Sequence, residues 1–291
     1  MTVLVFGRSG QVATALAREA AARGVALQAL GRADIDVLDE TALVDAVTRI
    51  GATAIVNAAA YTAVDKAETD RDAAFALNAQ APGLMAKVCA GRGLPFVHLS
   101  TDYVFDGTAH GPYGERDPLA PLGAYGASKA EGERLVMQQH PQAVVLRTAW
   151  VYYEQGQNFV RTMLRLGRER DEVRVVDDQV GNPTYAADIA ETCLAIVAQL
   201  GAGARHAGVF HYAGSGAVSW FGFAQAIFAE AARAGRRVPR SVVPITTAEY
   251  PTPAKRPANS QLSCGRLNDA FGIAPKPWGD RLKVCLERIA D

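Results

Sequence analysis

Residues 2–13 read TVLVFGRSGQVA, an apolar run that ends in a glycine-rich turn and continues into a helical pattern. Gly7, Gly10 and Ala13 follow one another at intervals of three residues. Glycine allows a tight turn and lets backbone N–H groups approach a phosphate at the helix N-terminus, while a small residue permits close helix packing. A plain strand–helix turn can have the same spacing. The position in the first strand–helix unit nevertheless favours a dinucleotide site.

The same alternation of strand and helix continues through the first half of the chain. Strand-like apolar runs follow at 26–31, 53–60, 95–101 and 143–152, with helical patterns between them at 40–50, 73–93 and 127–139. Strands that are apolar on both faces and alternate with helices are typical of a parallel sheet covered on both sides. We therefore predict an α/β fold with a Rossmann-type, doubly wound parallel sheet.

The pattern becomes less regular beyond about residue 150. Helical patterns at 158–170 and 187–200 and a strand-like run at 209–214 are followed by proline-rich sequence such as PTPAKRP. We predict a Rossmann domain over residues 1–150, with elements returning to it near 186–214. A smaller, irregular α/β lobe that binds substrate is expected mainly from 151–185 and 215–291.

Composition argues against several classes of protein. Thirty Lys and Arg balance thirty Asp and Glu, so no net charge would draw the chain to nucleic acid or to an anionic membrane. No apolar run is long enough to span a membrane, and the first residues lack the basic leader and cleavage site of a signal peptide. The four cysteines are far apart in sequence. They predict neither a disulfide framework nor a zinc site and favour a reducing cytoplasm.

The end of the second strand indicates which dinucleotide would bind. An acidic residue there would suit the ribose 2′-OH of NAD, but the sequence has Gly31-Arg32, and arginine suits a 2′-phosphate. We expect NADPH and keep NADH as an alternative, since Arg32 could also be a solvated loop charge. The residues predicted to contact the cofactor in this part of the chain are Gly7, Ser9, Gly10, Gln11, Val12, Arg32, Asp36, Ala58, Ala59 and Ala60.

Two stretches carry candidate catalytic side chains. The fourth strand-like run ends in STDYVFDG, which places Ser100, Thr101 and Asp102 at the sheet edge where open α/β sheets bind ligands. AYGASKAE, at 124–131, has Tyr125 and Lys129 four residues apart, on one face of a helix.

These side chains suit ketone reduction. An ammonium beside a phenol lowers the phenol pKa, so Lys129 is expected to tune Tyr125 as a general acid. A hydroxyl of Thr101 or Ser100 could bond the same substrate oxygen. Hydride from a nicotinamide and a proton from Tyr125 would together reduce a ketone.

The order of motifs gives a more specific prediction. FGxxGQV, VNAAAYTAVDKAE, STDYVFDG, YGxSKxxGE, LRTAWVY, DQxGxPTY and RPxxSxL run from residue 6 to residue 262. This series resembles the dTDP-4-dehydrorhamnose reductase family of extended short-chain dehydrogenases. The resemblance implies reduction of the 4-keto group of dTDP-4-dehydro-L-rhamnose to dTDP-L-rhamnose, a precursor of bacterial surface polysaccharides. It also makes residues 1–150 an NADP-binding domain.

The resemblance also implies roles for individual residues. Tyr125 would be the proton donor, Lys129 its tuner and a ligand of the nicotinamide ribose, and Thr101 the hydroxyl that polarises the carbonyl. The implied substrate contacts are Thr101, Asp102, Trp150, Asn158 and Arg256. Core packing remains an alternative for Trp150, and solvation remains one for Arg256.

Alternatives to this reading remain. The chain could be another nucleotide-sugar epimerase or dehydratase of the extended branch, since Asp102 beside Thr101 is the kind of acid that dehydratases use. It could also resemble the non-catalytic regulatory subunit of methionine adenosyltransferase, although the catalytic residues are all present.

The sequence says less about metal binding and about the oligomeric state. Some members of the family form magnesium-bridged dimers through an early carboxylate of the first helix. ATALAREA has no acid before Glu19, so no metal site is predicted, and a homodimer is left open.

Overall fold

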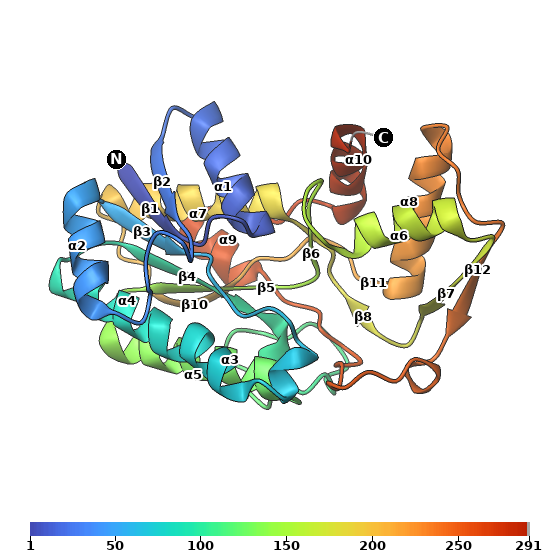
Figure 1. Cartoon of the computed structure of the whole chain (residues 1–291), viewed down its shortest axis with the longest axis horizontal. Helices are drawn as coiled ribbons and strands as arrows, with labels where there is room; N and C mark the ends of the chain where they lie inside the picture. The colour runs from blue at the N-terminus through green and yellow to red at the C-terminus, as the bar shows by residue number, and fades with distance from the viewer. Residues whose placement is uncertain (290–291) are drawn as a thin grey trace.

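The computed structural model describes residues 1–289, so the last two residues of the predicted 215–291 segment lie outside the described part. Within these residues, six strands form one parallel sheet in the order β10–β5–β4–β3–β1–β2 (Figure 1). Their bounds are β1 Thr2–Phe6, β2 Ala26–Leu30, β3 Ala54–Asn57, β4 Phe96–Thr101, β5 Val144–Thr148 and β10 Gly208–His211. The predicted doubly wound α/β sheet is confirmed.

Helices cover both faces of this sheet (Figure 1). One face carries α1 Gln11–Ala22 and α7 Ala186–Gly201, and the other carries α2 Glu40–Ile50, α4 Ala81–Gly91 and α5 Ala124–Gln139. Side chains of a strand alternate between the faces: in β1, Val3 and Val5 pack toward α1, whereas Leu4 and Phe6 pack toward α2. Both sets are fully buried, which explains why the strands read as continuous apolar runs.

The strand predicted over residues 143–152 is wrong in its length. β5 ends at Thr148, and a separate two-residue strand, β6 Val151–Tyr152, pairs with β9 Thr184–Tyr185 outside the large sheet. Trp150 causes the break, because its backbone has φ +47°, a left-handed conformation that cannot continue a strand. The chain therefore leaves the sheet at Trp150 and enters the second lobe.

The predicted helix over 73–93 is not one regular helix. It begins as α3 Arg71–Phe75, passes through a π-helical turn at Ala76–Gln80 and continues as α4. Asn78 lies in this turn, where its side chain accepts from Tyr61 N–H and donates to the Tyr61 carbonyl and to the Ser128 hydroxyl. The turn thereby ties the chain that follows β3 to α5, and such turns are frequent at functional sites.

The second lobe is built on helices and two-stranded ribbons, on the right of Figure 1. The predicted helix at 158–170 is confirmed as α6 Phe159–Glu169, whereas three helices after residue 214 were not predicted from the sequence. The other elements of this lobe are β7 Glu172–Val176, β8 Val180–Gly181, β11 Val218–Ser219, α8 Trp220–Arg233, β12 Ser241–Ile245 and α10 Trp278–Arg288. The helix α9 Gly265–Phe271 instead packs against β10 of the large sheet, where Phe271 meets Phe210. β12 pairs with β7, and β11 pairs with β8.

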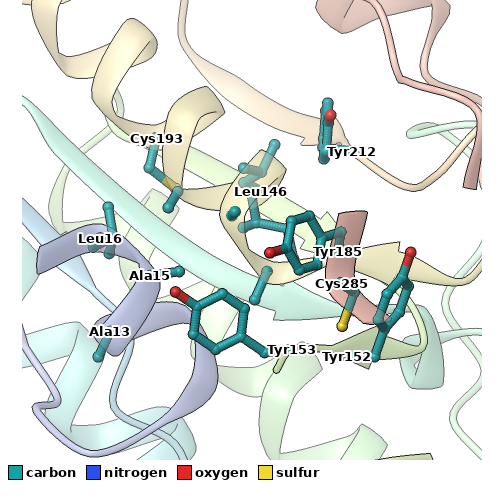
Figure 2. Packing of buried hydrophobic residues seen from close by; sticks show 14 of the residues in the cluster. Ala13, Ala15, Leu16, Leu146, Tyr152, Tyr153, Tyr185, Cys193, Tyr212 and Cys285 are labelled. Carbon is teal, nitrogen blue, oxygen red and sulfur yellow. The ribbon is translucent and has the colours of Figure 1, made fainter. Parts of the chain in front are cut away.

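Tyrosines join the two lobes in one core. Figure 2 shows Ala13, Ala15 and Leu16 of α1 near Tyr153 and Tyr185, in a cluster that reaches Cys285 of α10. The rings of Tyr152 and Tyr153 lie 5.6 and 5.7 Å from that of Tyr185. Because this core is continuous and fully buried, it holds the second lobe against the α1 face of the sheet.

Candidate active site

The carboxyl ends of β1 and β3 form the centre of the site. The chain goes from β1 to α1 on one face and from β3 to α3 and α4 on the other, so a crevice opens between the two strand ends. Gly7 has φ +103°, and a Cβ there would lie 2.9 Å from the backbone of Ala58 and Ala59. Only glycine fits, because the loop lies directly against the end of β3.

The N-terminus of α1 faces this crevice. Gly10 is its N-cap, and no side chain among residues 1–289 caps the helix there. A Cβ on Gly10 would meet nothing within 4 Å, so the position is open. The first N–H groups of α1 are therefore available to a phosphate, which the helix dipole also favours.

The end of β2 is marked by an ion pair that the sequence did not suggest. Arg8, inside the glycine loop, lies 2.8 Å from the Asp34 carboxylate, which also accepts from Gly31 N–H. Arg32 is exposed beside them, and Asp36 accepts from Leu38 N–H within its own turn. Two arginines, Arg8 and Arg32, thus lie near the end of β2, although the sequence predicted only Arg32 there. The position of Arg8 between the loop glycines Gly7 and Gly10 was the sequence signal that could have identified it.

The helix that carries Tyr125 is held from a distance. α5 begins at Ala124, three residues before the predicted start, and Ala124 N–H donates to the Glu68 carboxylate at 2.7 Å. Glu68 belongs to the DKAE stretch after β3, so it caps α5 with a negative charge at the positive end of the helix. A Cβ on Gly126 would lie 2.1 Å from the Tyr103 carbonyl, so α5 approaches the end of β4 closely.

This approach brings two tyrosines together. The rings of Tyr125 and Tyr103 meet edge to face, with centroids 5.5 Å apart. The guanidinium carbon of Arg256 lies over the Tyr103 ring, 6.0 Å from its centroid. Tyr103 was not singled out from the sequence, although it lies inside the STDYVFDG motif.

Lys129 is buried behind Tyr125. Its ammonium nitrogen donates to the Leu99 carbonyl at 2.6 Å and lies 3.4 Å from His98 Nε2. Burial lowers the pKa of Lys129 to about 8, while the charge of Glu133 acts in the opposite direction.

The expected lowering of the Tyr125 pKa by Lys129 is wrong for this chain. Burial instead raises the pKa of Tyr125 to about 12, and hydrogen bonding by Thr101 only partly opposes the rise. The reason is geometric, because the contacts of the lysine nitrogen are with Leu99 and His98. Tyr125 is therefore a protonated phenol at neutral pH.

Thr101 and Asp102 lie together at the end of β4. The Thr101 hydroxyl donates to Asp102 Oδ1 at 2.8 Å, and Asp102 Oδ2 is buried without a hydrogen-bond partner among residues 1–289. Burial raises the pKa of Asp102 to about 7, against an ordinary value of 3.8. A carboxyl group that is half protonated near neutrality thus adjoins Tyr125 and Thr101.

A cavity of about 830 Å³ extends from Tyr103 into the second lobe. Arg256, Asp65 and Tyr103 line it on the sheet side, and Phe159 and Trp220 line it on the side of the second lobe. Arg256 makes a 2.9 Å ion pair with Asp65, and its side chain is 19% exposed. The predicted residue Arg256 is therefore a partly buried cation beside the cavity rather than a solvated charge.

Trp150 and Asn158 lie where the two lobes meet. The Trp150 ring stacks on Trp220 with centroids 3.4 Å apart, and its indole N–H donates to Ser260. Asn158 caps α6 and donates to Gln11 in the glycine loop at 3.0 Å and to the Tyr153 carbonyl. Both side chains have partners within the chain, and Asn158 connects the glycine loop to the second lobe.

Some kinds of site are not seen. No group of three or more His, Cys, Asp or Glu that could hold a metal ion occurs in residues 1–289. None of the helices in that range is long and apolar enough to cross a membrane. All four cysteines are free and buried.

Comparison with known proteins places the chain among reductases. Residues 1–290 match the family described as RmlD substrate binding domain. A curated dTDP-4-dehydrorhamnose reductase of Burkholderia thailandensis is 44% identical over 296 residues, which cover 99% of each chain. A solved dTDP-4-dehydrorhamnose reductase of Clostridium acetobutylicum has a TM-score of 0.91, 36% identity and 99% coverage of each chain. The reductase of Bacillus anthracis, in complex with NADP, has a TM-score of 0.89, 34% identity and 99% coverage of each chain.

Asp102 generates a prediction about stability and pH. Its pKa is about 7 in the folded chain, against an ordinary value of 3.8. The folded chain therefore binds an extra proton between these values, and stability falls as pH rises through this range, by up to about 4 kcal/mol for this group. The Asp102→Asn variant lacks this titrating group. In urea unfolding, we therefore expect the free energy of unfolding of the variant, minus that of wild type, to increase from about pH 5 to about pH 8. A difference that stays constant over this range would mean that the pKa of Asp102 is not raised.

Proposed function

Because the chain belongs to the dTDP-4-dehydrorhamnose reductase family, we propose that it reduces dTDP-4-dehydro-L-rhamnose to dTDP-L-rhamnose with NADPH. The observation that carries this proposal is the convergence of Tyr125, Thr101 and the open glycine loop at one edge of the sheet. The match to named reductases over nearly the whole chain supports the choice of substrate.

The crevice between β1 and β3 fits a dinucleotide. A side chain at Gly7 would fill it, the N-terminus of α1 is open at Gly10, and Ala58–Ala60 present small, partly exposed side chains. We propose that Gly7, Ser9, Gly10, Gln11 and Val12 hold the pyrophosphate side and that Ala58, Ala59 and Ala60 lie against the cofactor. When bound, NADPH supplies a hydride.

The other end of the cofactor would lie at the end of β2. We propose that Arg32 contacts the adenosine 2′-phosphate there, with Asp36 on the adenosine side. The exposed position of Arg32 and the second cation, Arg8, support this placement. At the nicotinamide end, Tyr125 and Lys129 complete the cofactor contacts.

Tyr125 is proposed as the proton donor. A phenol with a pKa of about 12 stays protonated at neutral pH, so it can give its proton to the more basic alkoxide that hydride addition produces at C4. The Thr101 hydroxyl is within reach of Tyr125 and donates to Asp102 in this structure; we propose that it turns to donate to the same substrate oxygen. Lys129, buried behind the tyrosine, would contact the nicotinamide ribose.

The nucleotide sugar is proposed to occupy the cavity between the lobes. Arg256, which lines the cavity, suits its diphosphate, and Asp102, next to the lining residue Tyr103, suits a sugar hydroxyl. Trp150, stacked on Trp220, and Asn158, bonded to Gln11, would shape the wall between sugar and cofactor. Much of the cavity lining comes from residues 151–185 and 215–291, which supports a substrate-binding role for this lobe.

A dehydratase or epimerase reaction is the second candidate, and the raised pKa of Asp102 beside Thr101 favours it. The two kinds of reaction differ in whether they consume the cofactor. A reductase consumes one NADPH for each sugar, whereas an epimerase or dehydratase returns its cofactor to the starting state.

Tyr125→Phe tests the proton donor. We expect turnover of dTDP-4-dehydro-L-rhamnose, followed by the absorbance of NADPH, to fall by about 10²-fold or more, because one proton-transferring group is lost. The affinity for NADPH, measured by fluorescence titration, should change little. Turnover at the wild-type rate would rule out the role, and wild-type protein that oxidises no NADPH would rule out the reaction.

Arg256→Met tests the diphosphate contact, with Lys255→Met as the matched control one residue away. Arg256 lines the cavity, whereas Lys255 is exposed and not part of its lining. Loss of a charge-assisted contact of about 1.5–3 kcal/mol should raise the KM for the nucleotide sugar by about 10- to 100-fold. The Lys255 variant should stay close to wild type. Equal effects of both variants would contradict a specific contact.

A further inference from the structure

Three buried polar side chains form a line behind Tyr125. They are Asn57 at the end of β3, His98 in β4 and Lys129 on α5, with exposures of 1%, 0% and 2%. Asn57 and His98 are register partners on neighbouring strands. Asn57 Nδ2 lies 3.0 Å from His98 Nδ1, and His98 Nε2 lies 3.4 Å from the Lys129 nitrogen. The strands β3 and β4 and the helix α5 thus contribute one member each.

The direction of the first hydrogen bond follows from the backbone. Ala59 N–H donates to Asn57 Oδ1 at 3.0 Å, which fixes that atom as the amide oxygen. The atom that faces His98 is therefore the amide NH₂, a donor, so His98 Nδ1 must accept. Burial, together with the charge of Lys129, lowers the pKa of His98 well below its ordinary value, so the ring is neutral. A neutral ring that accepts at Nδ1 carries its proton on Nε2.

That proton points at the lysine. An ammonium has three donors and no acceptor, so an Nε2–H group aimed at it places donor against donor. A neutral amine has a lone pair that can accept the Nε2–H, and it still has an N–H for the Leu99 carbonyl at 2.6 Å. The hydrogen-bond line therefore fits the amine form of Lys129 better than the ammonium.

We propose that Asn57 and His98 are positioning residues for Lys129: Asn57 fixes the imidazole proton on Nε2, and this N–H favours the neutral amine of the lysine over its ammonium. The proposal deepens the proposed function, since it rests on Lys129 being a group of that active site. It gives the lysine a protonation change near neutral pH that a solvated lysine would not have.

Other charged and titratable groups around Lys129 act in known directions. Glu133, one turn further along α5, favours the ammonium. Its carboxylate is already held by Arg147 of β5 at 2.6 Å and accepts from the Ser100 hydroxyl of β4. Tyr125 on α5 stays neutral, and Asp102 at the end of β4 titrates near 7. Because Arg147 and Ser100 already bind Glu133, its charge is only partly available to stabilise the Lys129 ammonium. Burial and the His98 Nε2–H both favour the neutral amine.

The first test reads the tautomer directly in the wild-type chain. ¹⁵N-labelled histidine reports by NMR which ring nitrogen carries the proton. The chain has five histidines, and His98→Gln assigns the signal. We expect His98 to show a protonated Nε2 and a bare Nδ1 that do not titrate from about pH 5 to about pH 9. A proton on Nδ1, or a titrating ring, would overturn the proposal.

The second test reverses the tautomer. Asn57→Asp keeps an acceptor for Ala59 N–H, but its second oxygen accepts from His98 Nδ1–H, so Nε2 becomes an acceptor for the ammonium. ¹³C-labelled lysine gives a titration for each of the six lysines. We expect the Lys129 midpoint to rise by about one pH unit or more in Asn57→Asp. An unchanged midpoint would contradict the role of Asn57.

A double variant separates the tautomer from simple charge. The added carboxylate would raise the Lys129 midpoint electrostatically with or without the imidazole. If the tautomer transmits the effect, the rise caused by Asn57→Asp should become clearly smaller in a His98→Gln background. A rise of the same size in both backgrounds would assign it to charge and overturn the proposal. These titrations use the protein without substrate or NADPH, so failure of the proposed reaction would be seen separately, in the NADPH assay.

Discussion

The carboxyl ends of β1 and β3 lie side by side, but the chain leaves them toward opposite faces of the sheet. Such a divergence creates a crevice that side chains of the sheet itself cannot fill, and open α/β folds bind ligands there. Other features of the site adapt to this constraint. Gly7 keeps the crevice free of a side chain, Gly10 leaves the helix end open, and Asn78 and Glu68 tie the segment after β3 to α5.

Burial, more than pairing, governs the proton chemistry at this edge. Close packing of α5 on the end of β4 raises the pKa of Tyr125 to about 12 and lowers that of Lys129 to about 8. The same environment raises the pKa of Asp102 to about 7. Environments that separate the pKa values of neighbouring groups commonly assign them different roles. Here burial keeps the phenol protonated, as the proposed reduction of a ketone requires.

Much of the fold could be predicted from the sequence because strand periodicity and glycine spacing are local signals. The six strands of the large sheet were found this way, and the positions of Tyr125 and Lys129 followed from helical spacing. The break at Trp150 was missed, since a left-handed tryptophan has no sequence signature and is fixed by stacking on Trp220.

Contacts between distant segments were equally hidden. Glu68 and Asn57 act on α5 and β4 from elsewhere in the sequence, and the sign of the Tyr125 pKa shift depends on burial that spacing cannot reveal. Three helices, α8, α9 and α10, were overlooked because glycine, proline and charged residues interrupt the apolar pattern around them. The candidate residues were thus identifiable one by one, whereas their orientation and protonation needed the folded chain.

Transfer of a label tests most directly that the glycine loop and the Tyr125 edge serve one reaction. The chain would be incubated with dTDP-4-dehydro-L-rhamnose and NADPH deuterated at both C4 positions of the nicotinamide, and the sugar would be analysed by NMR. The proposed reaction places one deuteron on C4 of the product and consumes one NADPH for each sugar. A converted sugar without deuterium at C4, or conversion without net loss of NADPH, would contradict it.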